Sequence, residues 1–121
     1  MLIAGIALAG ALGALARYLV DVAVIRRDAL GLPVATLAIN VTGSFVLGVL
    51  TGLVLYHALP ATPKAVLGTG FCGAYTTFST FAYEVVHLVE QRKTREALST
   101  LALSFVLPAL LAALGLALAS L

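Results

Sequence analysis

Four long apolar stretches, separated by short connections, account for nearly the whole chain. They cover roughly residues 2–24, 33–59, 64–90 and 97–121. Each has at least the length, about 20 apolar residues, that an α-helix needs to cross the hydrocarbon core of a bilayer. The pattern therefore predicts four transmembrane helices within a single domain, residues 1–121, with no length left for a separate soluble module.

The third stretch differs from the others because small and polar residues occupy its middle. Three glycines and three threonines lie within residues 68–77. A helix that breaks inside a bilayer exposes backbone groups that hydrocarbon cannot satisfy, so a break persists only against protein, water or an ion. These residues leave two interpretations open: a break at residues 73–77 whose carbonyls could serve as Na⁺ ligands, or an unbroken glycine-rich helix packed closely on its neighbours.

The composition supports lipid as the solvent of this chain. Hydrophobic residues make up 62% of the sequence and charged residues only 10%, and the mean hydropathy is +1.14. A soluble domain needs a far richer charged surface. We therefore expect a multi-pass protein of the cell (plasma or inner) membrane. No basic stripe indicates a nucleic-acid partner, and the single cysteine excludes an internal disulfide.

Two ionisable residues, Arg17 and Glu84, lie inside the apolar stretches, whereas the other charges cluster near their ends. On insertion scales, each such residue costs about 2.5–3.5 kcal/mol at the bilayer centre, so each needs a partner or water. From the residues alone, Arg17 would extend to the interface. Glu84 could occupy a water-filled entrance or pair with a basic loop residue.

Three further residues suggest contact with an anion. Asn40 lies inside the second stretch, where its amide could either bond to another helix or donate an N–H to an ion. Phe78 and Phe81 are three positions apart and share one helix face. The two rings could simply face lipid or the protein core. Alternatively, they could border a polar path, because the rim of an aromatic ring carries partial positive charge and can attract an anion. The sequence has no catalytic triad, phosphate loop, zinc signature or paired carboxylates, so we do not expect an enzyme.

Three strings connect the chain to a known family: GALGALARY at residues 10–18, NVTGSF at residues 40–45 and GFCGAYTTFSTF at residues 70–81. In order and spacing they resemble the Fluc (CrcB) fluoride channel family over the whole chain. The resemblance implies an all-α membrane protein of four transmembrane helices with a break in the third, assembled as a dual-topology antiparallel dimer. It also implies a passive fluoride channel that exports F⁻ from the cytoplasm and lowers fluoride toxicity.

The resemblance also implies roles for particular residues. Two backbone carbonyls of each subunit, those of Gly73 and Thr76, would hold a structural Na⁺ at the dimer centre. Arg17 would be structural, and Gly43 and Gly48 would allow close helix packing. The implied fluoride pore comprises a donating amide, two aromatic edges, three hydroxyls and a vestibule carboxylate, which are Asn40, Phe78, Phe81, Ser79, Thr80, Ser104 and Glu84.

The partners and the class of protein leave alternatives open. The first and third connections carry five basic residues and the second carries one. This imbalance favours a single orientation, and hence a heterodimer with an oppositely oriented homologue, although we expect a homodimer because acidic residues offset part of the imbalance. A small dual-topology proton-coupled drug exporter would need a carboxylate deep in the first helix, where this chain has Arg17. An accessory membrane subunit would leave the polar centre of the third stretch unexplained.

Overall fold

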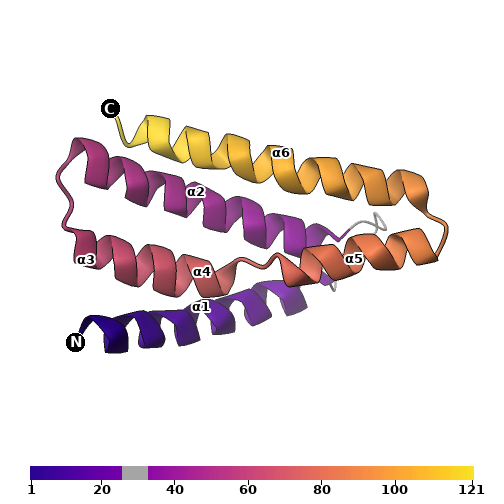
Figure 1. Cartoon of the computed structure of the whole chain (residues 1–121), viewed down its shortest axis with the longest axis horizontal. Helices are drawn as coiled ribbons and strands as arrows, with labels where there is room; N and C mark the ends of the chain where they lie inside the picture. The colour runs from indigo at the N-terminus through magenta and orange to yellow at the C-terminus, as the bar shows by residue number, and fades with distance from the viewer. Residues whose placement is uncertain (26–32) are drawn as a thin grey trace.

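The computed structural model describes residues 1–25 and 33–121, and this part of the chain is helical without strands (Figure 1). Its long helices are α1 (Leu2–Ile25), α2 (Val34–Tyr56) and α6 (Thr94–Leu118). Among the described residues, these are the 3 helices long and apolar enough to cross a membrane. The prediction of an α-helical membrane protein is therefore confirmed at this level.

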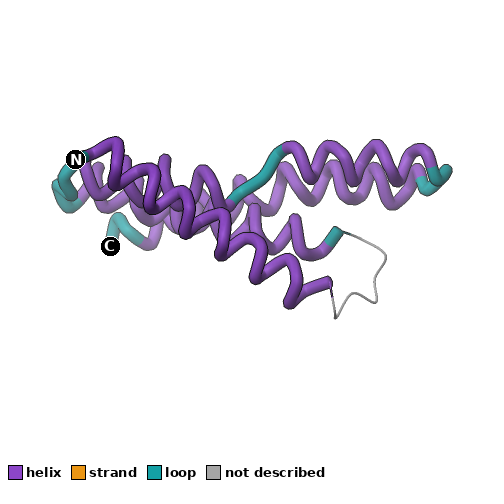
Figure 2. The backbone as a smooth tube through the Cα atoms, turned by 90° about the horizontal axis from the view of Figure 1, so that it is seen from below, coloured by secondary structure: helices purple, strands orange, loops and turns teal. Residues whose placement is uncertain are grey.

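The third apolar stretch forms four shorter segments rather than one long helix. The first is α3 (Ala61–Lys64), followed directly by the π-helical segment η1 (Ala65–Cys72) and by α4 (Gly73–Tyr75). Helix α5 (Ser79–Glu90) begins after residues 76–78, which lie outside any helix. Figure 2 shows these residues as a short connection in the middle of the molecule.

The long helices differ slightly from the predicted ranges at their ends. Helix α2 ends at Tyr56, before residue 59, and the chain then turns at Ala58, whose φ of 52° lies outside the helical region. Helix α6 begins at Thr94, before residue 97. The basic residues that precede the fourth apolar stretch therefore take part in the first turn of α6 or lie directly before it.

Successive membrane-length segments run in opposite directions along the molecule. Helices α2 and α6 therefore point the same way, and both termini lie at one end (Figure 1). Helix α2 packs most extensively on α6, α1 packs on η1 and α4, and α5 packs on α6. At the end that carries the termini, His57 Nε2 donates to the Ala119 carbonyl at 2.8 Å. This bond joins the C-terminal ends of the two parallel helices.

Glycines allow α2 and α6 to approach each other closely. A Cβ atom at Gly48 would overlap the Ala112 carbonyl of α6, and one at Gly115 would overlap the Phe45 carbonyl of α2. Small residues have this role in membrane helices, where van der Waals contact rather than the hydrophobic effect holds helices together. At Gly48 the backbone of α6 therefore occupies the space that a side chain would need.

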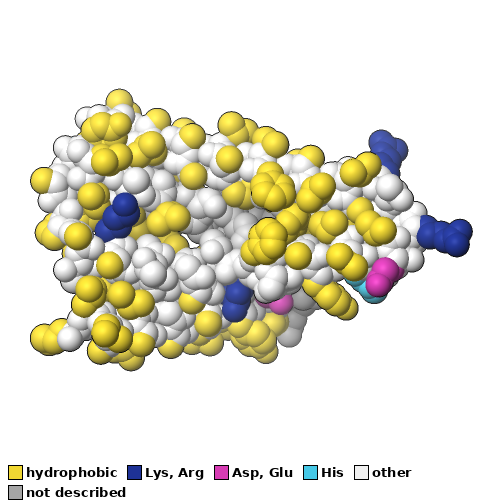
Figure 3. Space-filling view, in the orientation of Figure 1, with side chains coloured by type: hydrophobic (Ala, Val, Ile, Leu, Met, Phe, Trp, Pro, Cys, Tyr) yellow, Lys and Arg dark blue, Asp and Glu magenta, His cyan; other side chains and the backbone are white. Residues whose placement is uncertain are grey.

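The surface of the molecule is strongly apolar (Figure 3). Large hydrophobic side chains are exposed on every long helix, for example Leu12, Leu47 and Phe105. Basic side chains gather at the end where α5 turns into α6 (Figure 3). A water-soluble monomer rarely exposes apolar patches of this extent, so this surface fits lipid or another membrane-embedded chain.

Candidate functional site

Asn40 of α2 bonds to the backbone of Thr77, in the connection between α4 and α5. Its Nδ2 donates to the Thr77 carbonyl at 2.9 Å, and the Thr77 N–H donates to Asn40 Oδ1 at 2.8 Å. In an unbroken helix, the Thr77 N–H would instead bond to the Gly73 carbonyl. Asn40 thus supplies partners for the unwound backbone, and the Gly73 carbonyl loses its usual one. A carboxamide has two N–H hydrogens, so one remains for another acceptor.

Thr76 and Thr77 set the local geometry of this connection. Thr76 has an extended conformation, with ψ at 161°, and its hydroxyl donates to the Cys72 carbonyl at 2.9 Å. The Thr77 hydroxyl accepts from the Thr80 N–H at 3.2 Å, as an N-cap side chain does if the helix is counted from Phe78, whose φ of −90° and ψ of −37° are helical. The chain therefore leaves the helix at Thr76 and re-enters one under the cap of Thr77.

Thr77 is a site residue that we did not single out from the sequence. Its side chain is 8% exposed, and its hydroxyl also donates to Thr80 Oγ1 at 3.0 Å and lies 3.3 Å from Ser79 Oγ. A threonine just before a helix is a recognised N-terminal signal. That signal could have identified Thr77 once a helix start at Phe78 was assumed.

An open cavity of about 290 Å³, here called the groove, lies beside the connection. It receives side chains from α2, η1, α5 and α6. Most residues that we expected to contact fluoride or Na⁺ border it. Those are Asn40, Gly73, Thr76, Phe78, Phe81 and Ser104, and Gly43, which we expected only to allow close helix packing, borders it as well.

A second open cavity of about 320 Å³, here called the polar cavity, lies between α1, α2 and the start of α5. Ser79 and Thr80 line it together with Arg17, so the structure places these two hydroxyls apart from Ser104. Asp21, in the last part of α1, also lines this cavity. Thr77 borders both the groove and the polar cavity.

The two predicted pore phenylalanines have different surroundings. Their rings meet edge to face, with centroids 5.6 Å apart and an interplanar angle of 62°. Phe81 is 6% exposed and makes a second edge contact with Phe105 of α6, at 5.8 Å and 89°. Phe78 is 71% exposed. Phe81 is thus held by its neighbours, whereas most of the Phe78 ring is available to a partner or an ion.

Glu84 of α5 pairs with Thr36 of α2. The Thr36 hydroxyl donates to Glu84 Oε1 at 2.7 Å, and Thr36 is 2% exposed. Glu84 Oε2 is buried, and none of the described residues bonds to it. Because a buried polar atom without a partner is costly, this oxygen calls for water or a further donor. Thr36 lines the polar cavity, so the pair connects Glu84 to that cavity. The basic residues of the first connection, Arg26 and Arg27, with which Glu84 could have paired, lie outside the described residues.

Arg17 points to the connection rather than to the interface that the sequence suggested. Its Nη1 donates to the Thr76 carbonyl at 3.4 Å. Thr76 thus offers its carbonyl to a cationic group, and the Gly73 carbonyl is released from helical bonding. Such oxygens suit a hard cation such as Na⁺. In the part of the chain that the structure describes, no cluster of His, Cys, Asp and Glu could hold a metal, so a cation here would depend on backbone oxygens.

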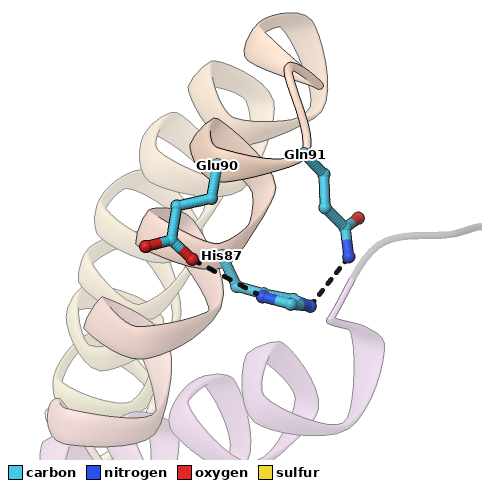
Figure 4. A network of polar contacts seen from close by, with 3 residues as sticks. All are labelled: His87, Glu90 and Gln91. Carbon is cyan, nitrogen blue, oxygen red and sulfur yellow. Dashed lines mark hydrogen bonds and ion pairs between the residues drawn. The ribbon is translucent and has the colours of Figure 1, made fainter.

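A separate polar network lies at the end of α5 (Figure 4). Gln91 Nε2 lies 2.8 Å from His87 Nε2, and His87 Nδ1 lies 3.9 Å from Glu90 Oε2. The His87 ring also stacks on Tyr83. These contacts are local to one helix end, and none of these residues lines the groove or the polar cavity.

Comparison with known proteins gives one consistent result. The family described as "CrcB-like protein, Camphor Resistance (CrcB)" matches residues 4–116. The chain is 52% identical over 100 residues to the fluoride-specific ion channel FluC 1 of Leifsonia xyli. The matched region covers 83% of this chain and 73% of the relative. It is 45% identical over 111 residues to FluC 2 of Mycobacterium tuberculosis, covering 92% and 85%. It is 44% identical over 101 residues to FluC of Methanocaldococcus jannaschii, covering 84% and 80%.

Proposed function

The chain belongs to the CrcB-like family, and we propose that it is a fluoride-specific ion channel and not an enzyme. It would let F⁻ leave the cytoplasm down its electrochemical gradient and so lower fluoride toxicity. Relatives that match most of its length carry this function in their names. The observation that carries the proposal is the convergence of Asn40, Phe78, Phe81 and Ser104 on one groove beside the non-helical residues 76–78.

The chemistry of the groove suits a small, strongly hydrated anion. An ion that leaves water must find donors that replace its hydration shell. The free N–H of Asn40 and the hydroxyl of Ser104 are such donors. The partially positive edges of Phe78 and Phe81 add attraction. None of these groups carries a full positive charge, so the ion is attracted without being trapped.

The polar cavity supplies a second set of hydroxyls, on Ser79 and Thr80. It is bordered by Thr36, whose hydroxyl is engaged by Glu84. Arg17 brings a positive charge to this cavity and Asp21 a negative one, so the attraction of an anion here depends on the hydroxyl donors. We propose that fluoride uses these groups as well as the groove, with Glu84 at the edge of the vestibule.

We further propose that two subunits assemble, because a single chain leaves polar groups of the third span uncovered. Gly73 is exposed, and the hydrogen bond between Thr42 and Tyr75, 3.0 Å long, is exposed as well. Backbone at membrane depth persists only where protein or water covers it. An antiparallel homodimer would cover this face. A heterodimer with an oppositely oriented homologue is the alternative that the uneven loop charges favour.

The same face would hold a structural Na⁺. The Gly73 and Thr76 carbonyls of each subunit would be its ligands, and the ion would fix two broken helices against each other. The freed Gly73 carbonyl supports this choice of ligands. The Thr76 carbonyl accepts from Arg17 and would bind the ion through its second lone pair. We place the protein in the plasma or inner membrane, with several membrane-crossing segments and both termini on one side.

Fluoride efflux from liposomes tests the proposal directly. Purified protein would be reconstituted as the only protein into vesicles loaded with potassium fluoride, and efflux would be started with valinomycin and followed with a fluoride electrode. Vesicles loaded with chloride are the control. We expect rapid fluoride release and little chloride release. Absence of fluoride release, also after addition of an oppositely oriented homologue, would contradict the proposed function, whereas release from the single chain would support the homodimer.

A further inference from the structure

The hydroxyl of Thr77 is engaged in every direction that its chemistry allows. It donates its hydrogen to Thr80 Oγ1 at 3.0 Å and accepts from the Thr80 N–H at 3.2 Å. Ser79 Oγ lies 3.3 Å away, where it can donate to the remaining lone pair. A hydroxyl has one hydrogen and two lone pairs. Thr77 therefore has a defined orientation, although it is buried and its hydroxyl has no capacity left for an ion.

This arrangement determines what the Thr80 hydroxyl can do. Since Thr80 Oγ1 accepts the hydrogen of Thr77, its own hydrogen must point away from Thr77. Thr80 is exposed and lines the polar cavity, and it donates to none of the described residues. Its hydrogen is thus available to a ligand in that cavity. An anion accepts hydrogen bonds and never donates, so an anion-binding cavity must present hydrogens rather than lone pairs.

Neighbouring contacts keep Thr77 in place. The Asn40 carboxamide holds both polar groups of the Thr77 backbone, at 2.9 and 2.8 Å. Thr77 also borders the groove on its other side. With the backbone fixed, the Thr77 hydroxyl can offer its hydrogen elsewhere only by losing its bond to Thr80 Oγ1.

We propose that Thr77 is a positioning residue for conduction, which directs the hydroxyl hydrogen of Thr80 into the polar cavity, where it meets the anion. This inference rests on the proposed fluoride channel function. It assigns Thr77 an effect on the ion through Thr80 rather than by contact. Without the Thr77 hydroxyl, Thr80 could turn its hydrogen toward another acceptor, and the cavity would lose one directed donor.

The test uses conservative variants in the fluoride efflux assay described above. Thr77→Val removes the hydroxyl and keeps the shape, and Thr77→Ser keeps the hydroxyl. Thr80→Val and the double variant complete a double-mutant cycle. The matched control is Thr51→Val, because among the described residues the Thr51 hydroxyl bonds only to the Leu47 carbonyl of its own helix. Size-exclusion chromatography would establish that each variant assembles like the wild type.

We expect Thr77→Val to lower the fluoride rate by roughly three- to tenfold, the effect of one lost hydrogen bond. Thr77→Ser should restore most of the rate, Thr51→Val should match the wild type, and the double variant should be no slower than Thr80→Val. A wild-type rate for Thr77→Val, or losses at the two positions that multiply, would overturn the inference. If Thr77 had only a structural role, Thr77→Val would still lower the fluoride rate in a chain that already carries Thr80→Val.

Should Thr77→Val fail to assemble, Thr77→Cys replaces it. The thiol has a similar shape and is a weak donor, so the fluoride rate of Thr77→Cys should fall below that of Thr77→Ser, and equal rates would overturn the inference.

The measurement on the wild-type protein separates this inference from the proposed channel function on which it rests. If the wild type passes no fluoride, the proposed channel function is contradicted. If the wild type passes fluoride and Thr77→Val does so equally fast, only the role of Thr77 is contradicted.

Discussion

The carboxamide of Asn40 bonds to both polar groups of the Thr77 backbone, 37 positions away along the chain, with distances of 2.9 and 2.8 Å. One side chain of α2 thereby satisfies the backbone where the helical structure of the third apolar stretch is interrupted. The sequence allowed Asn40 either to join helices or to donate to an ion. The structure shows that Asn40 joins α2 to the third apolar stretch. Its second N–H is not used in this contact, and donation of that N–H to an ion is a proposal.

We predict that Asn40→Leu destabilises the protein, because it leaves a buried carbonyl and N–H without partners. The expected loss is about 1–3 kcal/mol for each unsatisfied group. Thermal unfolding in detergent should show a clearly lowered midpoint, and fluoride efflux should be lost. Thr51→Val, a polar-to-apolar change on the same helix, is the control and should keep the wild-type midpoint. An unchanged midpoint for Asn40→Leu would show that the bonds to Thr77 are not needed.

We predict that replacement of both Phe78 and Phe81 by Ile abolishes fluoride efflux, because aliphatic side chains have no positively polarised edge. The single variants should differ in stability. Phe81→Ile removes contacts of a buried ring with Phe105 and should lower the unfolding midpoint, whereas Phe78→Ile should barely change it in detergent, since Phe78 is largely exposed. Fluoride efflux of the double variant at the wild-type rate would contradict a pore role for these rings.

We predict that Gly48→Ala weakens the packing of α2 on α6. The added methyl group would overlap the Ala112 carbonyl, and such overpacking costs about 1–3 kcal/mol. Gly10→Ala is the matched control, since a Cβ at Gly10 has its nearest neighbour, the Gly70 carbonyl oxygen, at an ordinary 3.6 Å. Unfolding midpoints of the two variants would be compared in the same detergent. Equal midpoints would argue against tight contact at Gly48.

We predict that fluoride efflux depends on Na⁺ if the Gly73 and Thr76 carbonyls bind this ion. Protein purified and reconstituted with N-methyl-D-glucamine in place of Na⁺ should lose most of its activity, and added Na⁺ should restore it. A second measurement is the proportion of dimer on a size-exclusion column, with and without Na⁺, because the ion would join the two subunits. Full activity and an unchanged dimer in protein freed of Na⁺ would refute the structural ion.

Several features of this protein follow from its sequence because they depend on local composition. Apolar length and the scarcity of charge require helices in lipid, and the described residues are helical. The concentration of glycine and threonine at residues 68–77 marks the region where the structure departs from a regular α-helix, through the π-helical η1 and the extended Thr76. The motifs GALGALARY, NVTGSF and GFCGAYTTFSTF identified the family, which the comparisons confirm.

Only the tertiary structure decided which of these residues meet. The direction of the chain changes at Thr76, so the side chains that follow no longer keep the 3.6-residue period from which faces are read. Ser79 and Thr80 of α5 face the polar cavity while Ser104 of α6 borders the groove, although the resemblance grouped all three. The packing of α5 and α6 on the other helices decides which cavity each side chain reaches. The pairing of Glu84 with Thr36, the approach of Arg17 to Thr76 and the bonds of Asn40 to Thr77 join segments far apart in the chain. Helix packing alone brings such segments together, and no local pattern encodes it.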